Sequence, residues 1–232
     1  MDINKFEREE KKYILSEEEY LILMRELNGL LIKDEYFKSN ILNIYFDTEN
    51  FDLIRKSIDK PIYKEKVRLR CYKVPSLEDK VFLEIKKKYK GIVTKRRIGL
   101  KLKEFYDYYN NGIINKDSQI MKEIDYLFKY YKLVPKLFLA YNRESYKYKE
   151  RLDVRITFDT NIRSRKEDLY LEMGDAGKLY FNEKVYLMEI KVLNSLPINL
   201  INVLNKQKIY PVSFSKYGSI YIKESDKECL TV

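Results

Sequence analysis

The sequence predicts an α+β fold in which an antiparallel sheet curls into a barrel and helices pack on its outside. First, successive strand-like segments alternate apolar and charged residues, so that each strand has one apolar and one charged face. Second, the segments between them have helical periodicity and enough apolar surface to cover the apolar faces. Third, glycine (7) and proline (5) are scarce and no linker or repeat divides the chain, which favours one domain over residues 1–232.

The first element is a strand over residues 5–15. The stretch "EREEKKY" places acids and bases close together, and two structures explain this pattern: a solvated helix or a strand with a charged face. On a strand, Arg8, Glu10 and Lys12 share one face, and the charged residues in between share the other. A register shift of one residue would exchange the two faces. The alternation alone leaves both registers open.

A helix over 16–30 follows this strand. Ser16 and Glu19 have the spacing of a capping box, and Gly29 is a stop signal. The next predicted elements are a strand over 41–48, a short helix over 50–58 begun by Asn50, and three consecutive strands over 65–74, 79–89 and 91–100.

The second half of the chain continues with a mostly helical segment over 101–131, broken near Asn110–Gly112. Residues 136–148 and 152–162 alternate in the manner of a hairpin. The remaining elements are a strand over 184–193, a helix over 197–207 with proline at its first position, and a final ordered segment over 213–224.

The charged faces of six strands repeatedly carry arginine or lysine with an occasional acid. A sheet with one solvated face explains any single strand, but such a face accepts Ser, Thr, Gln and Glu as readily. Two like charges ~4 Å apart repel by roughly 4 kcal/mol at an effective dielectric of 20. We therefore expect an elongated polyanion to neutralise this face, and the few interior acids to hold a divalent cation or to pair with the bases.

Composition narrows the chemistry further. The chain has 46 basic and 36 acidic residues, a formal charge of +10, and no histidine. A histidine-activated nucleophile and a histidine-ligated zinc or iron site are thus excluded, and a metal would need oxygen ligands. Two distant cysteines, no apolar stretch of ~20 residues and an N-terminus without an apolar signal region predict a cytoplasmic protein without a membrane span.

Eight stretches carry a resemblance to a known family, in the family's order: "FEREEKKY", "IYFDTENFDLIRKSID", "KVRLRCY", "VFLEIKKKYKGIVTKRRI", "LAYNRESY", "RITFDTNI", "LMEIKVLNSLP" and "FSKYG". The pattern resembles the polyphosphate polymerase domain of the VTC (vacuolar transporter chaperone) family, a branch of the triphosphate tunnel metalloenzymes. The resemblance implies an eight-stranded antiparallel tunnel barrel with outer helices. It also implies ATP as phosphate donor, ADP as leaving group, and Mn²⁺ or Mg²⁺ as cofactor.

The resemblance also implies site residues. Its phosphate-binding bases match Lys12, Arg68, Arg70, Lys86, Lys95, Arg97, Arg143 and Lys216. Because the first strand of the family ends in Lys-Tyr, as Lys12 and Tyr13 do here, the resemblance favours the register that points Arg8, Glu10 and Lys12 inward. Further substrate-binding candidates, from their position beside these residues or on the same inferred faces, are Arg8, Arg155, Lys191 and Ser215. Glu189 matches the metal-binding glutamate of the family, and Glu10 is a second candidate metal ligand.

The function implied is transfer of the terminal phosphoryl group of ATP to a growing polyphosphate chain. Two alternatives remain open: a metal-dependent tunnel triphosphatase, with water as acceptor, and a catalytically silent binder of polyanions or nucleic acid. ATP and polyphosphate are the expected partners, nucleic acid is disfavoured, and the sequence names no protein partner.

Overall fold

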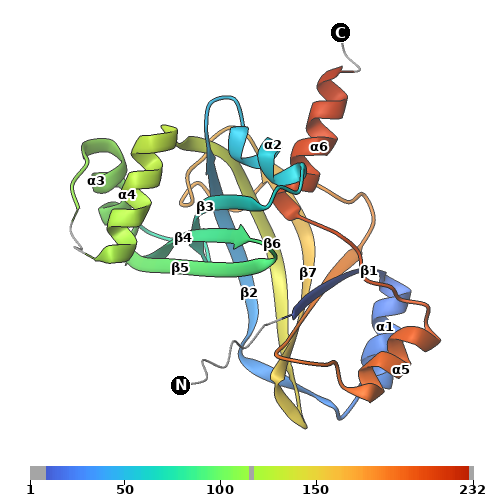
Figure 1. The fold of residues 1–232 in the computed structure, drawn as a ribbon. Helices are drawn as coiled ribbons and strands as arrows, with labels where there is room; N and C mark the ends of the chain where they lie inside the picture. The colour runs from blue at the N-terminus through green and yellow to red at the C-terminus, as the bar shows by residue number, and fades with distance from the viewer. Residues whose placement is uncertain (1–8, 115–117, 230–232) are drawn as a thin grey trace. The chain divides into compact units, whose positions relative to one another are not determined.

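The computed structural model describes residues 9–114 and 118–229, with side chains up to residue 226 (Figure 1). Its elements are, in chain order, β1 (Glu9–Ser16), α1 (Glu17–Glu26), β2 (Leu31–Asp47), α2 (Asp52–Ile58), β3 (Tyr63–Cys71), β4 (Lys80–Tyr89), β5 (Ile92–Lys101), α3 (Leu102–Asn111), α4 (Gln119–Tyr131), β6 (Val134–Tyr148), β7 (Arg151–Arg165), β8 (Lys178–Leu179), β9 (Val185–Val192), α5 (Ile198–Lys206) and α6 (Lys216–Cys229).

Eight strands form one hydrogen-bonded path in the order β1-β9-β7-β6-β2-β3-β4-β5, and the short β8 pairs with β7. The register is antiparallel for β1 with β9, β7 with β9, β2 with β3, β3 with β4, and β4 with β5. The predicted α+β class with an eight-stranded, mainly antiparallel sheet is confirmed. Within the described residues, β1 and β5 end the path without pairing, so hydrogen bonds do not close the barrel-like sheet. Both edge strands are rich in charged residues, which disfavour further pairing.

The chain groups into two compact units. One contains the described residues up to Ser39, Tyr141–Ile162 and Leu179–Phe214; the other contains Asn40–Ala140, Arg163–Lys178 and the described residues from Ser215 onward. Strands β2, β6 and β7 contribute to both units. The single domain over 1–232 stays a prediction.

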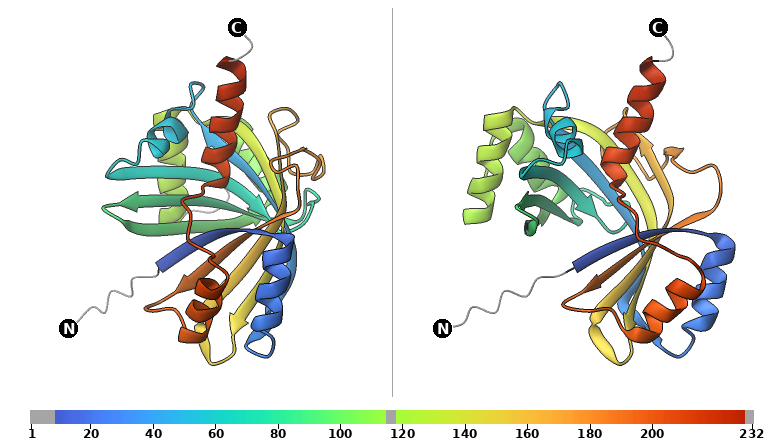
Figure 2. Two further views of the ribbon diagram at one scale, coloured as in Figure 1. Left: turned by 90° about the vertical axis from the view of Figure 1, so that its right-hand side faces the viewer. Right: turned by 45° about the vertical axis from the view of Figure 1, so that its right-hand side comes forward.

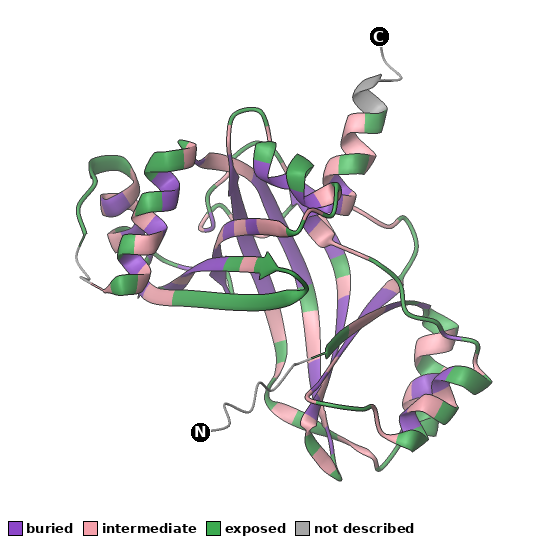
Figure 3. Ribbon diagram, viewed as in Figure 1, coloured by how far each residue is buried: buried purple, intermediate pink, exposed green. Residues whose placement is uncertain are grey.

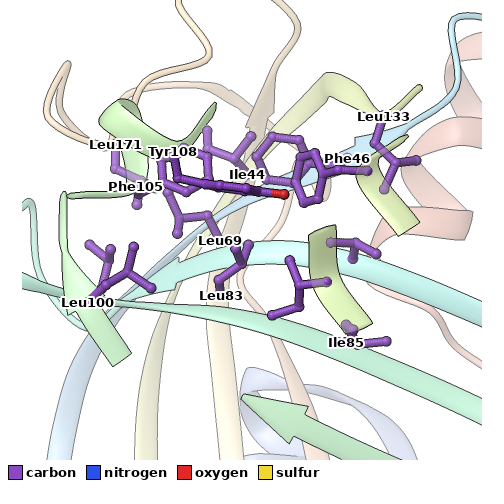
Figure 4. Close-up of a cluster of buried hydrophobic side chains, with 14 of the residues drawn as sticks. Ile44, Phe46, Leu69, Leu83, Ile85, Leu100, Phe105, Tyr108, Leu133 and Leu171 are labelled. Atoms are coloured by element: carbon purple, nitrogen blue, oxygen red, sulfur yellow. The ribbon is translucent and has the colours of Figure 1, made fainter. Parts of the chain in front are cut away.

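In the unit that contains β3, β4 and β5, the apolar face of the sheet packs against α3 and α4. Figure 4 shows Ile44, Leu69 and Leu83 of the strands close to Phe105 and Tyr108 of α3. All of these side chains are buried. The alternation of apolar and charged residues therefore directs the apolar side of β3 and β4 toward the helices, as the sequence predicts.

In the unit that contains β1 and β9, helices α1 and α5 cover the apolar face. The two helices lie side by side (Figure 2) and contact each other. Leu23 of α1 and Leu200 of α5 are fully buried with Ile156 of β7 and Ile190 of β9. The helices thus pack on the outside of the charged face in this unit as well.

Several predicted boundaries are confirmed and others are wrong. The capping box at Ser16 and Glu19 is present, with both hydrogen bonds formed, and Gly112 ends α3 in the left-handed conformation (φ 70°). Asn50 does not begin α2, because Phe51 occupies the N-cap position with φ 60° and makes no side-chain cap. Pro197 is the N-cap of α5 rather than its first helical residue.

The largest differences concern length and the C-terminal element. Strand β2 extends back to Leu31, ten residues before the predicted start at 41, and none of its first ten residues is fully buried. The final ordered segment is the helix α6, tied to β2 by the hydrogen bond from the Tyr217 hydroxyl to Asp47 (3.0 Å). Among the described residues, no helix combines the length and apolar character needed to cross a membrane.

Candidate functional site

Two charged faces lie opposite the two apolar cores. The β3–β5 face is made by residues that alternate with the buried ones on three neighbouring strands: Lys66, Arg68, Arg70, Glu84, Lys86, Lys95 and Arg97. The β1–β9 face belongs to the other unit and is made by Glu10, Lys12, Arg143, Arg155, Thr157, Asp159, Glu189 and Lys191. Figure 3 shows that β5, at the end of the first face, is exposed along most of its length.

Arg68 is held by a buried carboxylate at the centre of the β3–β5 face. Its Nε and Nη2 atoms donate to Oε2 of Glu84 at 2.8 and 2.7 Å, and Nη1 donates to the Tyr45 hydroxyl at 3.1 Å. The Glu84 side chain is 1% exposed and the Arg68 side chain 20% exposed. Glu84 therefore fixes the guanidinium in one orientation while part of it stays accessible.

Lys95 contacts the same carboxylate, at 2.6 Å from its Nζ to Oε1 of Glu84. Burial alone raises the pKa of Glu84, but the positive charges of Arg68, Arg70 and Lys95 outweigh it and hold that pKa at about 2. Partial burial lowers the pKa of Lys95 to about 8; Glu84 acts against this change, and Arg68 and Arg70 add to it. Burial and the neighbouring arginines therefore bring the pKa of Lys95 close to neutral pH.

Further bases of this face have fixed partners. Arg70 is buried and donates from Nε to the Asn43 side chain at 2.9 Å. Lys66 donates to the Ser215 hydroxyl at 3.0 Å, and the same oxygen accepts from the backbone N–H of Gly218, in the first turn of α6. Ser215 therefore connects the start of α6 to the charged side of β3.

The other predicted bases of this unit are more accessible. Lys86 is exposed, and its register partners are Lys66 and Lys95. Arg97 is also exposed, with its guanidinium over the Phe82 ring at 4.7 Å from the centroid. Lys216 is half-buried and begins α6. The structure brings Arg68, Arg70 and Lys95 together around Glu84, with Lys86 and Arg97 as their strand neighbours.

On the β1–β9 face, bases and acids alternate along two neighbouring strands. Lys12 and Glu189 are register partners, as are Glu10 and Lys191. Lys191 lies 2.9 Å from Glu189 and 3.7 Å from Glu10, and Lys12 donates to the carbonyl of Phe214 at 2.9 Å. Tyr13 and Leu15 are buried in the core, so the preferred register of the first strand is confirmed.

Arg143 is paired with a fully buried acid. Its Nε and Nη2 atoms donate to the two carboxylate oxygens of Asp159 at 2.6 and 2.8 Å, and Nη2 lies 3.7 Å from Glu189. Burial lowers the pKa of Arg143, but Asp159, Tyr141 and Glu189 outweigh it and raise that pKa above its usual value. The guanidinium is a permanent positive charge beside Glu189.

Two predicted substrate contacts need comment. Arg155 lies on the charged face but pairs with Asp34 at 3.0 Å and donates to the Ser145 hydroxyl at 3.3 Å, so β2 and β6 hold it in place. Arg8 lies outside the described residues.

The donor set of the β1–β9 face fits a divalent cation that binds together with phosphate. Within the described parts of the chain, no three acidic, histidine or cysteine side chains gather in a ready-made metal site. Glu189 and Glu10 offer the carboxylate oxygens that Mg²⁺ and Mn²⁺ prefer, and the Thr157 hydroxyl is buried without a hydrogen-bond partner. Because Lys191 already pairs with both glutamates, a cation would need the added negative charge of a phosphate to compete.

Sequence reasoning expected the interior acids, Glu84 among them, to hold a cation or to pair with the bases, but it gave no role to Asn43, Lys66 or Tyr45. Glu84 orients Arg68 and Lys95, Asn43 holds Arg70, and Lys66 contacts Ser215. Tyr45 resembles a packing residue in the sequence, yet its hydroxyl accepts from Arg68. A shared strand parity is the only sequence signal for these residues, and it does not reveal partners on other strands.

The affinity for tripolyphosphate is expected to fall about tenfold as the pH rises from 7 to 9.5. A change of this size corresponds to the loss of roughly one charge-assisted hydrogen bond. Above pH 8, Lys95 loses its positive charge. Burial raises the pKa of Tyr45, but Arg68, Arg70 and Lys66 bring it down to about 8, so this phenol gains a negative charge over the same range. Isothermal titration across the range measures the effect.

Lys95→Arg and Tyr45→Phe are the matched controls, because neither replacement titrates there. Each single variant should remove part of the change in tripolyphosphate affinity with pH, and the double variant should remove most of it. Profiles identical to that of the wild type would show that other groups, such as the ligand itself, cause the pH dependence.

One solved structure with a TM-score above 0.5 shows the same fold. A proposed adenylate cyclase from Bacillus halodurans has a TM-score of 0.55 and 16% sequence identity, covering 90% of this chain and 95% of that one. A proposed adenylate cyclase from Vibrio parahaemolyticus (TM-score 0.49, 9% identity, 92% and 97% covered) and the mimivirus capping enzyme triphosphatase (TM-score 0.36, 13% identity, 87% and 88% covered) are more distant.

The sequence itself matches a family model. No curated protein sequence is similar enough to the chain to count as a match. The model of the VTC domain matches residues 7–222, which include both charged faces and nearly all of the 232-residue chain. The chain therefore belongs to the VTC domain family.

Proposed function

We propose that this protein is a polyphosphate polymerase that transfers the terminal phosphoryl group of ATP to a growing polyphosphate chain and releases ADP. The observation that carries the proposal is the group of Arg68, Arg70 and Lys95 around Glu84 in a chain of the VTC domain family. Fixed cations on a rigid sheet suit a substrate made of successive phosphates.

In this mechanism the β3–β5 face holds phosphates and keeps them in line. An oxygen of the terminal phosphate of the chain forms a bond to the γ-phosphorus of ATP, the bond to the ADP oxygen breaks, and ADP leaves with the electron pair. The attacking oxygen is already ionised, so no general base is required, in agreement with the absence of histidine. Arg68 and Lys95 neutralise charge on the transferring group, and Glu84 keeps both in position.

The β1–β9 face would bind the divalent cation. Glu189 and Glu10 would be its ligands from the protein, and bound Mn²⁺ or Mg²⁺ would offset negative charge on the phosphates. Lys12 and Arg143 add permanent positive charges beside these carboxylates.

Incubation with ATP and Mn²⁺ should yield a phosphate polymer, with one ADP released for each phosphate added to the chain. The measurement is gel electrophoresis of the polymer beside chromatography of the nucleotides. Orthophosphate without polymer would favour the tunnel triphosphatase. Cyclic AMP with pyrophosphate would indicate cyclase chemistry, and no turnover with or without Mn²⁺ would leave only a polyanion binder.

A further inference from the structure

The Thr157 hydroxyl is a buried polar group without a partner. The residue is 4% exposed, and its Oγ1 atom makes no hydrogen bond with any described residue. Buried hydroxyls are normally hydrogen-bonded, and one without a partner needs an explanation, such as a ligand that is bound in the working state. Threonine is also not needed for packing here, since valine has the same shape without the unsatisfied oxygen.

The strand geometry places this hydroxyl beside Glu189. Ile156 and Phe158 are buried in the core, so the residue between them lies on the opposite, charged face of β7. Thr157 and Glu189 are register partners in the antiparallel pair of β7 and β9. Directly opposite residues have Cβ atoms about 4.5–5.5 Å apart, so one ion can contact both side chains.

Of the two carboxylates nearby, Glu189 is the one placed to share such a ligand. Asp159 has both oxygens occupied by Arg143, and Glu189 is the acid that lies directly across from Thr157. Mg²⁺ in phosphate-binding proteins commonly uses one or two carboxylates, substrate phosphates and waters, and a Ser or Thr hydroxyl ligates it in P-loop sites. A neutral hydroxyl adds an oxygen ligand without adding charge among the flanking bases.

We propose that the Thr157 hydroxyl is a ligand of the divalent cation that binds with the phosphates at Glu189. The inference rests on the proposed function, because it assigns a further residue to the same metal site. In this arrangement the cation is held by Glu189, by Thr157 and by the phosphates. The Thr157 Oγ1 atom, which has no hydrogen-bond partner, is available to bind the cation.

The test compares tripolyphosphate binding with excess Mg²⁺ and with EDTA by isothermal titration. For Thr157→Val we expect the dissociation constant with Mg²⁺ to rise at least about tenfold, the usual scale for losing a residue that supports a metal. The value in EDTA should not change. The melting temperature without ligands should stay equal or rise, because the buried unsatisfied hydroxyl is gone. Thr157→Ser keeps the hydroxyl and should retain the Mg²⁺ effect.

Thr160→Val is the matched control, the same substitution on the same strand but on the face that carries Ile156 and Phe158. The inference is overturned if Thr157→Val leaves both dissociation constants unchanged, or weakens binding equally with Mg²⁺ and with EDTA. A wild-type chain that binds tripolyphosphate equally under both conditions would overturn the metal site itself. A wild-type chain that does not bind tripolyphosphate would contradict the proposed function.

Discussion

Arg68→Ala is expected to lower ATP turnover by about 10²–10³-fold, the usual cost of removing one preorganised donor from a transition state. Arg68 is the base that Glu84 holds with two hydrogen bonds at the centre of the β3–β5 face. The same substitution leaves the 1%-exposed Glu84 carboxylate with less compensation. Breaking a buried ion pair from one side costs about 3–5 kcal/mol, so the free energy of unfolding should also fall, with Lys95 limiting the loss.

The two effects separate in a double variant. Arg68→Met with Glu84→Gln removes both charges and keeps similar volumes, and replacement of a buried pair by neutral groups is often tolerated. Urea denaturation should show most of the stability restored, while ATP turnover stays low. Recovery of turnover in the double variant would mean that Arg68 acts only through stability, and wild-type turnover in Arg68→Ala would remove it from the site.

Arg96→Ala, on β5 of the same sheet, is the matched control. Arg96 points to the opposite side of β5, where it forms an ion pair with Glu123 at 2.9 Å with 49% of its side chain exposed. Exposed pairs of this kind contribute about 0–1 kcal/mol. Turnover and stability should therefore both stay close to the wild type.

The faces of the strands could be predicted from the sequence because alternation is a local property. In "VRLR", Val67 and Leu69 lie on the same face of the strand and both face the core. Arg68 and Arg70 therefore lie on the opposite face. For the first strand alternation left two registers open, and only the resemblance favoured the one in which Lys12, rather than Lys11, shares a face with Glu189, as the structure shows.

Partners across strands could not be predicted in the same way. That Glu84 lies opposite Arg68 and next to Lys95 depends on the register of three strands, and turn geometry and packing set that register. Whether Thr157 has a hydrogen-bond partner likewise depends on every element around it. A sequence therefore gives the members of a charged face more readily than the pairs within it.

Element lengths were missed where local signals conflicted. The first half of β2, "LIKDEYFKSN", mixes apolar and charged residues without clean alternation and so gives little periodic signal, although it continues directly into the strongly apolar "ILNIYF". The segment "SKYGSIYIKE" contains glycine and β-branched residues that weaken a helical interpretation. Tertiary contacts decide for the helix α6: the Ser215 hydroxyl accepts from Gly218 in its first turn, and Tyr217 reaches Asp47.

Bound polyanions are expected to raise the melting temperature in the order of their length. On the β3–β5 face the strand register aligns cations in successive rows: Lys66, Lys86 and Lys95, then Arg68 and Arg97, then Arg70. Rows two residues apart lie about 7 Å from each other along the strands. Orthophosphate can contact one row, whereas tripolyphosphate can extend from one row toward the next, so it should stabilise more than pyrophosphate, and pyrophosphate more than phosphate.

A ligand at ~100 times its dissociation constant stabilises the fold by roughly 2.7 kcal/mol, which is on the order of 5–10 °C for a chain of this size. Thermal unfolding at matched ionic strength measures the three anions side by side. Arg70→Ala removes the last row and should reduce the advantage of tripolyphosphate over pyrophosphate, while Arg96→Ala should leave it unchanged. Equal small shifts for all three anions that vanish in added chloride would contradict a built polyanion site, because only a general surface charge is screened so completely.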